Sequence, residues 1–211
     1  MAYLFIRPSK LHLLVESTNI KIPKDSVLFR ARISRNNEEF TCKDLGKPPN
    51  EKSRGGRANP QGIPYLYVAS DSMTAISEVR PNITDKVTVG KFMLHDSLSI
   101  VDLRNPSIDS PFRFRYNLRH YLMHLGFLRI LSLEISKPIS PKAAELDYLP
   151  LQYLCEFIKN QDYDGVAYES SLTDGYNVAI FLDDKLECQR TKTHLIKNID
   201  YEIMEANSQD K

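Results

Sequence analysis

Arginine and glutamate side chains that could act on a phosphate-bearing substrate gather in one stretch of the sequence. Residues 54–62 form a glycine-rich loop that contains Arg54 and Arg57, and Glu78 follows in a predicted short helix. Glycine lets a backbone approach a ligand closely, and arginine can hold phosphate oxygens through two parallel hydrogen bonds. From composition alone, a solvated basic loop and a surface glutamate are the better interpretation, because short motifs often match by chance.

Two further polar groups lie on predicted strands. Arg30 and Arg32 alternate with apolar residues over 27–33, so both side chains share one strand face and need either solvent or an anion. Ser170 follows the predicted strand 165–168 and opens a polar turn, as serines commonly do. Taken singly, each group fits an exposed surface.

The order of these stretches closely resembles that of the RES-domain family, which is named for an arginine, a glutamate and a serine. The matching segments are Arg30, the loop 55–62, the run 65–80, the helix segment beginning at 148–152, and the segment 165–181. In this chain the three naming residues look like Arg30, Glu78 and Ser170. The resemblance covers about residues 27–182.

The resemblance implies an ADP-ribosyltransferase-like fold and an enzyme that consumes NAD⁺. It implies cleavage of the nicotinamide–ribose bond by water, as in a glycohydrolase, or by inorganic phosphate as a co-substrate, as in a phosphorylase, with action as a toxin or antiviral effector. Such proteins are commonly restrained by an Xre-type helix-turn-helix antitoxin, which makes an antitoxin the expected partner. No metal, direct nucleic-acid contact or membrane contact is expected, and an oligomer is compatible with the sequence.

The same resemblance suggests roles for individual side chains. Glu78, Arg30 and Ser170 are the expected catalytic residues, and the expected NAD⁺-binding residues are Arg30, Arg57, Tyr67, Ser170 and Asn177. Breaking the bond develops positive charge on the ribose, and an ionised carboxylate near that ring stabilises the transition state more than the ground state. This chemistry suits Glu78.

Two other functions remain open at this stage. A transferase that attaches ADP-ribose to a macromolecule would use the same side chains, since pocket shape decides the acceptor. A catalytically silent interaction module is the third reading, and the intact Arg30, Glu78 and Ser170 count against it.

Hydrophobic patterning predicts an α+β protein with one or two small mixed or antiparallel sheets around a cleft, flanked by helices. The predicted strands are 27–33, 65–69, 87–94, 99–102, 165–168 and 176–182, and the predicted helices lie within 71–79, 112–132 and 150–160. A short helix around 9–17 and one or two weak strands in the tail are also expected. The predicted division is a leader at 1–26, a RES domain at 27–182, and a C-terminal extension of that domain at 183–211.

Composition narrows the class of protein. The net charge is +1, from 28 Lys and Arg against 27 Asp and Glu, which argues against a general nucleic-acid binder. The five histidines show no metal-ligand spacing. The three scattered cysteines, Cys42, Cys155 and Cys188, fit a reducing compartment better than a disulfide scaffold. The absence of a signal peptide or membrane span predicts a cytoplasmic location.

Overall fold

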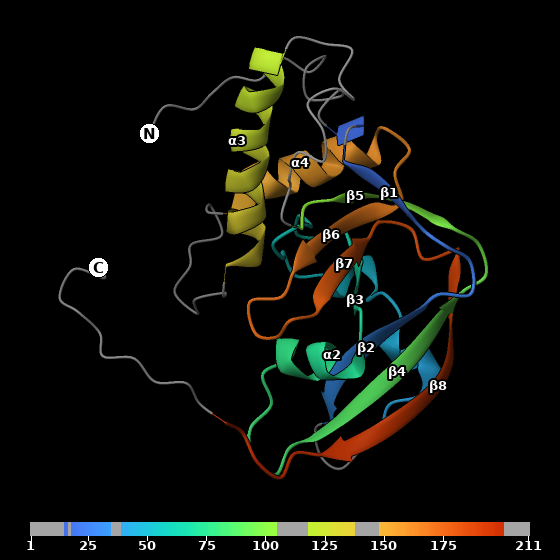
Figure 1. Cartoon of the computed structure of the whole chain (residues 1–211). Helices are drawn as coiled ribbons and strands as arrows, with labels where there is room; N and C mark the ends of the chain where they lie inside the picture. Colours follow the sequence, from blue (N-terminus) through green and yellow to red (C-terminus); the bar gives the residue numbers. More distant parts are fainter. Residues whose placement is uncertain (1–14, 17, 35–38, 105–117, 138–147, 201–211) are drawn as a thin grey trace, which may run out of the picture.

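The computed structural model describes residues 15–16, 18–34, 39–104, 118–137 and 148–200 (Figure 1). Within these ranges a single mixed sheet has eight strands in the order β1-β5-β6-β7-β3-β2-β4-β8. Their bounds are β1 Asn19–Ile22, β2 Val27–Ser34, β3 Leu66–Ala69, β4 Lys86–Leu94, β5 Leu98–Asp102, β6 Gly165–Glu169, β7 Tyr176–Ile180 and β8 Leu186–Leu195. β5 and β6 are parallel, and the other neighbouring pairs are antiparallel.

The helices are α2 (Ser72–Glu78), α3 (Leu118–Ser136) and α4 (Leu149–Lys159), together with two short 3₁₀ turns, η1 (Cys42–Leu45) and η2 (Asn50–Lys52). In Figure 1, α3 and α4 lie at the β5–β6 end of the molecule, whereas α2 lies beside β2. No helix in the described ranges is long and apolar enough to cross a lipid bilayer.

Alternation along the central strands divides the core between two faces of the sheet. Val166 and Tyr168 of β6 pack with apolar residues of α3 and α4, whereas Ala167 between them packs with the cluster on the opposite face. Successive strand residues point to opposite faces, so the buried strands carry apolar residues at nearly every position. The face covered by α3 and α4 is also the face that carries Tyr67.

The short helix α2 is fixed at its start and along one side. The Asp71 carboxylate accepts a hydrogen bond from the Thr74 amide at 2.8 Å, which caps the helix. Ala75 then packs against Ala31 of β2 and Ala69 of β3 in a small apolar cluster. Small residues on both sides bring the helix close to the sheet, and Glu78 is the last residue of the helix.

The predicted α+β class is confirmed, with one mixed sheet. Four of the predicted strands, at 27–33, 65–69, 165–168 and 176–182, are adjacent in the sheet, in the order β6-β7-β3-β2. β1 lies within the predicted leader and pairs with β5 at one edge, and the tail carries the ten-residue strand β8. The predicted helix at 9–17, the start of the predicted helix at 112–117 and the end of the tail at 201–211 fall largely or wholly outside the described residues.

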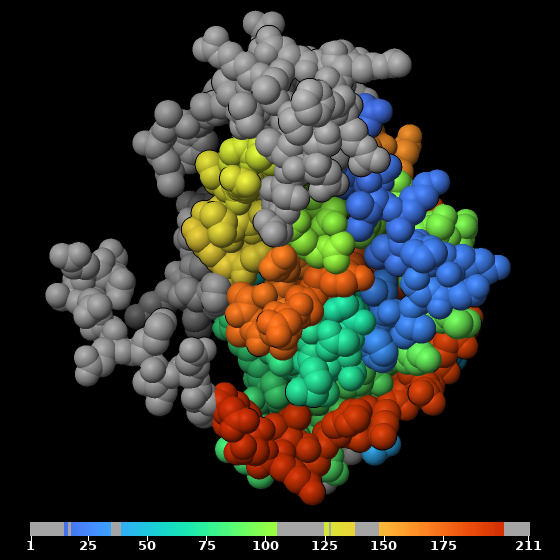
Figure 2. Space-filling view, viewed as in Figure 1, coloured from blue at the N-terminus to red at the C-terminus, as the bar shows by residue number. Residues whose placement is uncertain are grey.

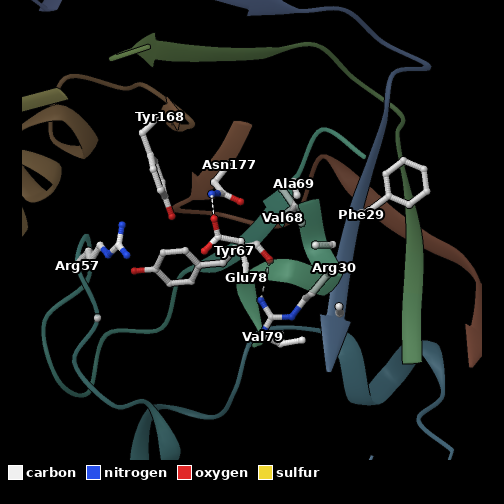
Figure 3. Close-up of a pocket in the computed structure, with 13 residues that line it drawn as sticks. Phe29, Arg30, Arg57, Tyr67, Val68, Ala69, Glu78, Val79, Tyr168 and Asn177 are labelled. Carbon is white, nitrogen blue, oxygen red and sulfur yellow. Dashed lines mark hydrogen bonds between the residues drawn. The ribbon is translucent and has the colours of Figure 1, made fainter. Parts of the chain in front are cut away.

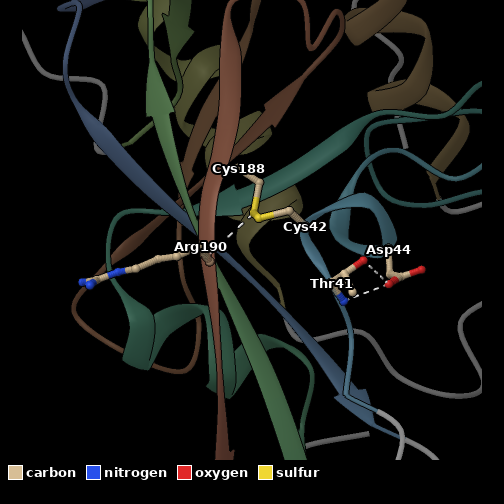
Figure 4. Close-up of a disulfide and its surroundings, with 5 residues drawn as sticks. All are labelled: Thr41, Cys42, Asp44, Cys188 and Arg190. Atoms are coloured by element: carbon tan, nitrogen blue, oxygen red, sulfur yellow. Dashed lines mark hydrogen bonds between the residues drawn. A yellow bond between two sulfur atoms is a disulfide. The ribbon is translucent and has the colours of Figure 1, made fainter.

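The cysteines were expected to fit a reducing compartment better than a disulfide scaffold, but two of the three form a disulfide. Cys42 in η1 is joined to Cys188 in β8, across a sequence separation of 146 residues (Figure 4). The two residues meet because Leu45 of η1 is fully buried in the core cluster that contains Phe92 of β4, and β4 pairs with β8. Cys155 is a buried free thiol. Nothing in the cysteine spacing reveals this pairing, because it depends on strand order.

Candidate active site

A pocket with a volume of about 310 Å³ lies on the sheet face between α2 and the glycine-rich loop (Figure 3). Five of the six residues predicted to form the site line it, namely Arg30, Arg57, Tyr67, Glu78 and Asn177. The sixth, Ser170, bonds directly to Glu78. The tertiary structure thus brings together side chains from β2, the loop, β3, α2, and the β6–β7 hairpin.

The Glu78 carboxylate is held by two donors that converge on one of its oxygens. The Ser170 hydroxyl and the Asn177 side-chain amide each donate to Oε1, both at 2.7 Å. Among the described residues, no hydrogen bond to Oε2 is present, so that oxygen remains available to a ligand. A carboxylate fixed in this way is oriented before any substrate arrives. Asn177 therefore contacts Glu78, in addition to lining the pocket.

Arg30 lies where β2 and β3 part. The two strands pair at one register position, Phe29 opposite Ala69, and the Arg30 Nη1 donates to the Tyr67 carbonyl at 3.1 Å. Burial, followed by the nearby Arg32, lowers the pKa of Arg30 to about 10, so the side chain stays charged at neutral pH. Its Nε is buried and has no hydrogen-bond partner among the described residues. A buried donor of this kind is costly unless a ligand satisfies it.

The Tyr67 ring lines the pocket, while its hydroxyl forms hydrogen bonds with the glycine-rich loop. The hydroxyl donates to the Asn59 side-chain oxygen at 2.7 Å and accepts from the Ala58 amide at 3.3 Å. Burial raises the pKa of Tyr67 well above its usual value, so the hydroxyl keeps its proton. Because the Tyr67 hydroxyl is occupied within the protein, the ring face is the part of this predicted NAD⁺-binding residue that is left for a ligand.

Asn59 is the centre of the loop, and the sequence analysis did not single it out. Its amide nitrogen donates to the backbone carbonyls of Arg54, Pro60 and Ile63 at 2.9–3.1 Å, and its side chain is buried. An Asn before a proline in a glycine-rich loop is a recognisable turn former. That signal could have identified Asn59 as the residue that gives the loop a fixed shape.

Arg57 and α4 attach the loop to the rest of the molecule. The Arg57 side chain is buried, and its Nη1 donates to the Ile135 carbonyl near the end of α3 at 2.6 Å. Gln152 of α4 donates to the Gly56 carbonyl at 2.8 Å. Arg57 therefore ties the loop to α3 and lines the pocket at once, whereas Arg54 is exposed.

Tyr168 of β6 is a pocket residue that sequence reasoning missed. Its ring is buried, and burial, Tyr67 and Glu78 together raise the pKa of its hydroxyl well above the usual value. Figure 3 shows this hydroxyl pointing toward the region of Glu78 and Tyr67. The sequence offered no sign of this, because a tyrosine in an apolar strand is equally suited to the core.

The described residues contain no group of three or more His, Cys, Asp or Glu side chains that could hold a metal ion. The chemistry available in the described pocket is therefore that of one oriented carboxylate, two arginines, and the ring faces of two tyrosines. This set suits a substrate with a region of developing positive charge and a separate anionic group.

The chain is similar in sequence to a known family and in fold to a solved toxin–antitoxin complex. A family model for the RES domain matches residues 27–202. No match was found among curated proteins. Among solved structures, the fold is similar to the crystal structure of the M. tuberculosis MbcT–MbcA toxin–antitoxin complex, with 12% sequence identity and a TM-score of 0.49, over 88% of this chain and 92% of that chain.

Proposed function

This chain belongs to the RES-domain family, and on that premise we propose that it is an enzyme that breaks the nicotinamide–ribose bond of NAD⁺. The observation that carries the proposal is the Glu78 carboxylate, held by Ser170 and Asn177 at the wall of a pocket that also contains Arg30 and Arg57. An oriented anion and a separate pair of cations match the two charged regions of this substrate.

The proposed chemistry places Glu78 beside the ribose. When the bond from the ribose C1′ to the nicotinamide nitrogen breaks, its electron pair leaves with nicotinamide, which becomes neutral and needs no proton from the enzyme. The ribose gains oxocarbenium character, and a nearby carboxylate stabilises that charge. Ser170 and Asn177 keep the carboxylate in place, so little reorganisation is needed during the reaction.

The proposed binding mode places the NAD⁺ diphosphate near Arg30 and Arg57. The unpartnered Arg30 Nε supplies a donor for a phosphate oxygen, and a charge-assisted bond of this type is stronger than a neutral one. The ring faces of Tyr67 and Tyr168 form an apolar wall for the nicotinamide ring. An ADP-ribosyltransferase-like fold forms part of this proposal.

The family also suggests a biological role. We propose that the protein acts as a toxin or antiviral effector through NAD⁺ depletion in the cytoplasm, and that an Xre-type helix-turn-helix antitoxin restrains it. The acceptor of the ADP-ribosyl group is water or inorganic phosphate. A protein acceptor would make the chain an ADP-ribosyltransferase.

Product analysis tests the function. Purified protein is mixed with NAD⁺, with and without inorganic phosphate, and the small molecules and the intact protein are examined by mass spectrometry. Release of nicotinamide with ADP-ribose supports hydrolysis, and ADP-ribose phosphate supports phosphorolysis. An ADP-ribosylated protein would favour the transferase. Unchanged NAD⁺ in every mixture would contradict the proposal and favour an interaction module.

A further inference from the structure

A partly buried polar network joins the start of α2 to the turn between β6 and β7, beside the candidate active site. It consists of Ser70, Asp71 and Thr74 on one side and the turn residues Thr173 and Gly175 on the other. The Thr74 hydroxyl lies 2.8 Å from the Thr173 hydroxyl, and Thr74 is almost completely buried. In Figure 2 the surfaces of α2 and of this turn abut.

The direction of the hydrogen bonds in this network follows from the chemistry of its groups. The Thr74 hydroxyl donates to Asp71 Oδ2 at 2.7 Å, because an ionised carboxylate can only accept. The Thr173 hydroxyl must therefore donate to Thr74, and it accepts from the Gly175 amide at 3.2 Å. A chain of hydrogen bonds thus runs from the turn backbone to the Asp71 carboxylate.

A second chain ends on the same carboxylate oxygen. The Ser70 hydroxyl donates to Asp71 Oδ2 at 2.9 Å and accepts from the Tyr176 amide at 3.1 Å. Each hydroxyl in the two chains donates once and accepts once, so each hydrogen bond polarises the next. Asp71 therefore receives bonds that originate at the two successive amides of Gly175 and Tyr176.

The cap of α2 does not need the Thr74–Thr173 pair. The cap is the bond from the Thr74 amide to Asp71 Oδ1, and it involves neither hydroxyl. What the hydroxyl pair adds is a connection to the turn, and Gly175 allows the two segments to approach closely. A Cβ at position 175 would lie 2.0 Å from the Thr74 Oγ1 and 2.6 Å from Asp71 Oδ2.

The turn held by this network is flanked by Ser170 and Asn177, the two residues whose side chains donate to Glu78. Ser170 precedes the turn, and its amide donates to the Gly175 carbonyl at 3.1 Å. Asn177 follows the turn in β7. Glu78 lies at the opposite end of α2 from the cap, so the network fixes the relative placement of the carboxylate and of both its donors.

We propose that Thr74 and Thr173 are positioning residues, forming a hydroxyl latch that holds the β6–β7 turn against α2 and so keeps Ser170 and Asn177 on Glu78. Neither threonine contacts the substrate; both act through the placement of the carboxylate. This inference rests on the proposed function for its catalytic consequence, whereas its structural consequence can be measured without any reaction.

The test compares Thr173→Val, which removes the hydroxyl at similar size, with Thr173→Ser, which keeps it. Misplacing a catalytic group slightly can lower a rate by up to two orders of magnitude, so kcat for NAD⁺ cleavage should fall roughly ten- to a hundredfold in Thr173→Val. KM should change far less, and Thr173→Ser should restore the rate. In a Glu78→Gln background, Thr173→Val should have little additional effect, because both changes act on the same group.

Thr193→Val is the matched control. The Thr193 hydroxyl also pairs with a threonine hydroxyl, that of Thr88 at 3.0 Å, but between β4 and β8 and away from the pocket. It should leave kcat near the unaltered value. Amide hydrogen exchange at Ser170 supplies the second readout, because this amide bonds across the turn to the Gly175 carbonyl and not to Thr173. Exchange there should be faster in Thr173→Val and unchanged in Thr173→Ser.

The outcomes separate the two proposals. If the unaltered protein cleaves NAD⁺ and Thr173→Val cleaves it equally fast, the proposed positioning role of Thr74 and Thr173 is wrong. The proposed NAD⁺-cleaving function is then unaffected. If the unaltered protein does not cleave NAD⁺, the function is wrong, and the exchange rate at Ser170 decides whether the latch holds the turn. Equal exchange in the Val and Ser variants would overturn the latch in either case.

Discussion

Glu78 is the side chain on which the proposed chemistry depends most. Glu78→Gln keeps the size of the side chain and an amide oxygen that can still accept from Ser170 and Asn177, but removes the negative charge. We expect kcat for nicotinamide release to fall on the order of a hundredfold or more, as for other electrostatic catalytic groups. The affinity for NAD⁺ should change far less, because the bound ribose is not yet cationic. Near-normal turnover of Glu78→Gln in a product assay would contradict the catalytic role of Glu78.

Arg30 and Arg57 each form a hydrogen bond within the protein and also line the candidate pocket. Arg30 satisfies the Tyr67 carbonyl where β2 and β3 part, and Arg57 satisfies the Ile135 carbonyl near the end of α3. In each case the guanidinium has further donors, since arginine carries five. The fold therefore orients both cations before the substrate binds.

At the scale of the element, the Asp71 cap of α2 should make the free energy of unfolding depend on pH. Burial tends to raise the pKa of Asp71, but bonds from the Thr74 hydroxyl, the Thr74 amide and the Ser70 hydroxyl outweigh it and lower the pKa. A lowered pKa stabilises the fold above the unfolded value of about 3.9, and this contribution is lost as the pH falls through the folded pKa.

The comparison of Asp71→Asn with the unaltered protein tests this pH dependence. We expect the unaltered protein to have the higher free energy of unfolding at neutral pH, and the difference to shrink below a pH of about 3.9. Urea unfolding across this pH range measures it. A difference that stays constant down to low pH would mean that the ionised carboxylate contributes nothing.

The glycine-rich loop is the second element that shapes the pocket, and Asn59 gives it its form. Asn59→Ala leaves the carbonyls of Arg54, Pro60 and Ile63 without their side-chain donor. We expect a loss of about 1–3 kcal/mol in the free energy of unfolding, the usual cost of buried unsatisfied groups. Urea unfolding measures it, and the exposed Asn198, which bonds to Asp200, is the control as Asn198→Ala. Equal effects in both variants would contradict the special role of Asn59.

At the scale of the whole molecule, the bond between Cys42 and Cys188 links the segment that precedes the loop to the edge strand β8. Cross-linking positions this far apart in sequence restricts the unfolded chain, typically stabilising a protein by roughly 2–5 kcal/mol. We expect Cys42→Ser and reduction by dithiothreitol to lower the melting temperature to a similar extent. Dithiothreitol should not lower it further in the Cys42→Ser variant.

Thiol labelling checks the pairing directly. Denatured protein that has not been reduced should take up one alkyl group, at Cys155, and reduced protein should take up three, as mass spectrometry can resolve. Three alkyl groups without prior reduction would show that the cysteines are unpaired in solution.

The sequence by itself predicted most of the local elements and named the candidate site residues. Periodicity placed the strands near Arg30, Tyr67 and Asn177 within a few residues of their observed bounds, because β3 and β7 are mostly buried and apolar and β2 alternates apolar and basic residues. The sequence offered Asp71 or Ser72 as the cap of the helix that bears Glu78, and the structure shows that Asp71 caps it. The order of motifs pointed to the same family that the residues 27–202 match.

Only the tertiary structure decided which groups those residues meet. Strand order is set by packing between segments far apart in the chain, so the sequence could not show that Cys42 faces Cys188, or that β1 lies at the sheet edge beside β5. The same holds for hydrogen bonds across the site. A side chain's partner depends on which backbone groups the folded sheet leaves unpaired, which is why Arg30 meets the Tyr67 carbonyl and Thr74 meets Thr173.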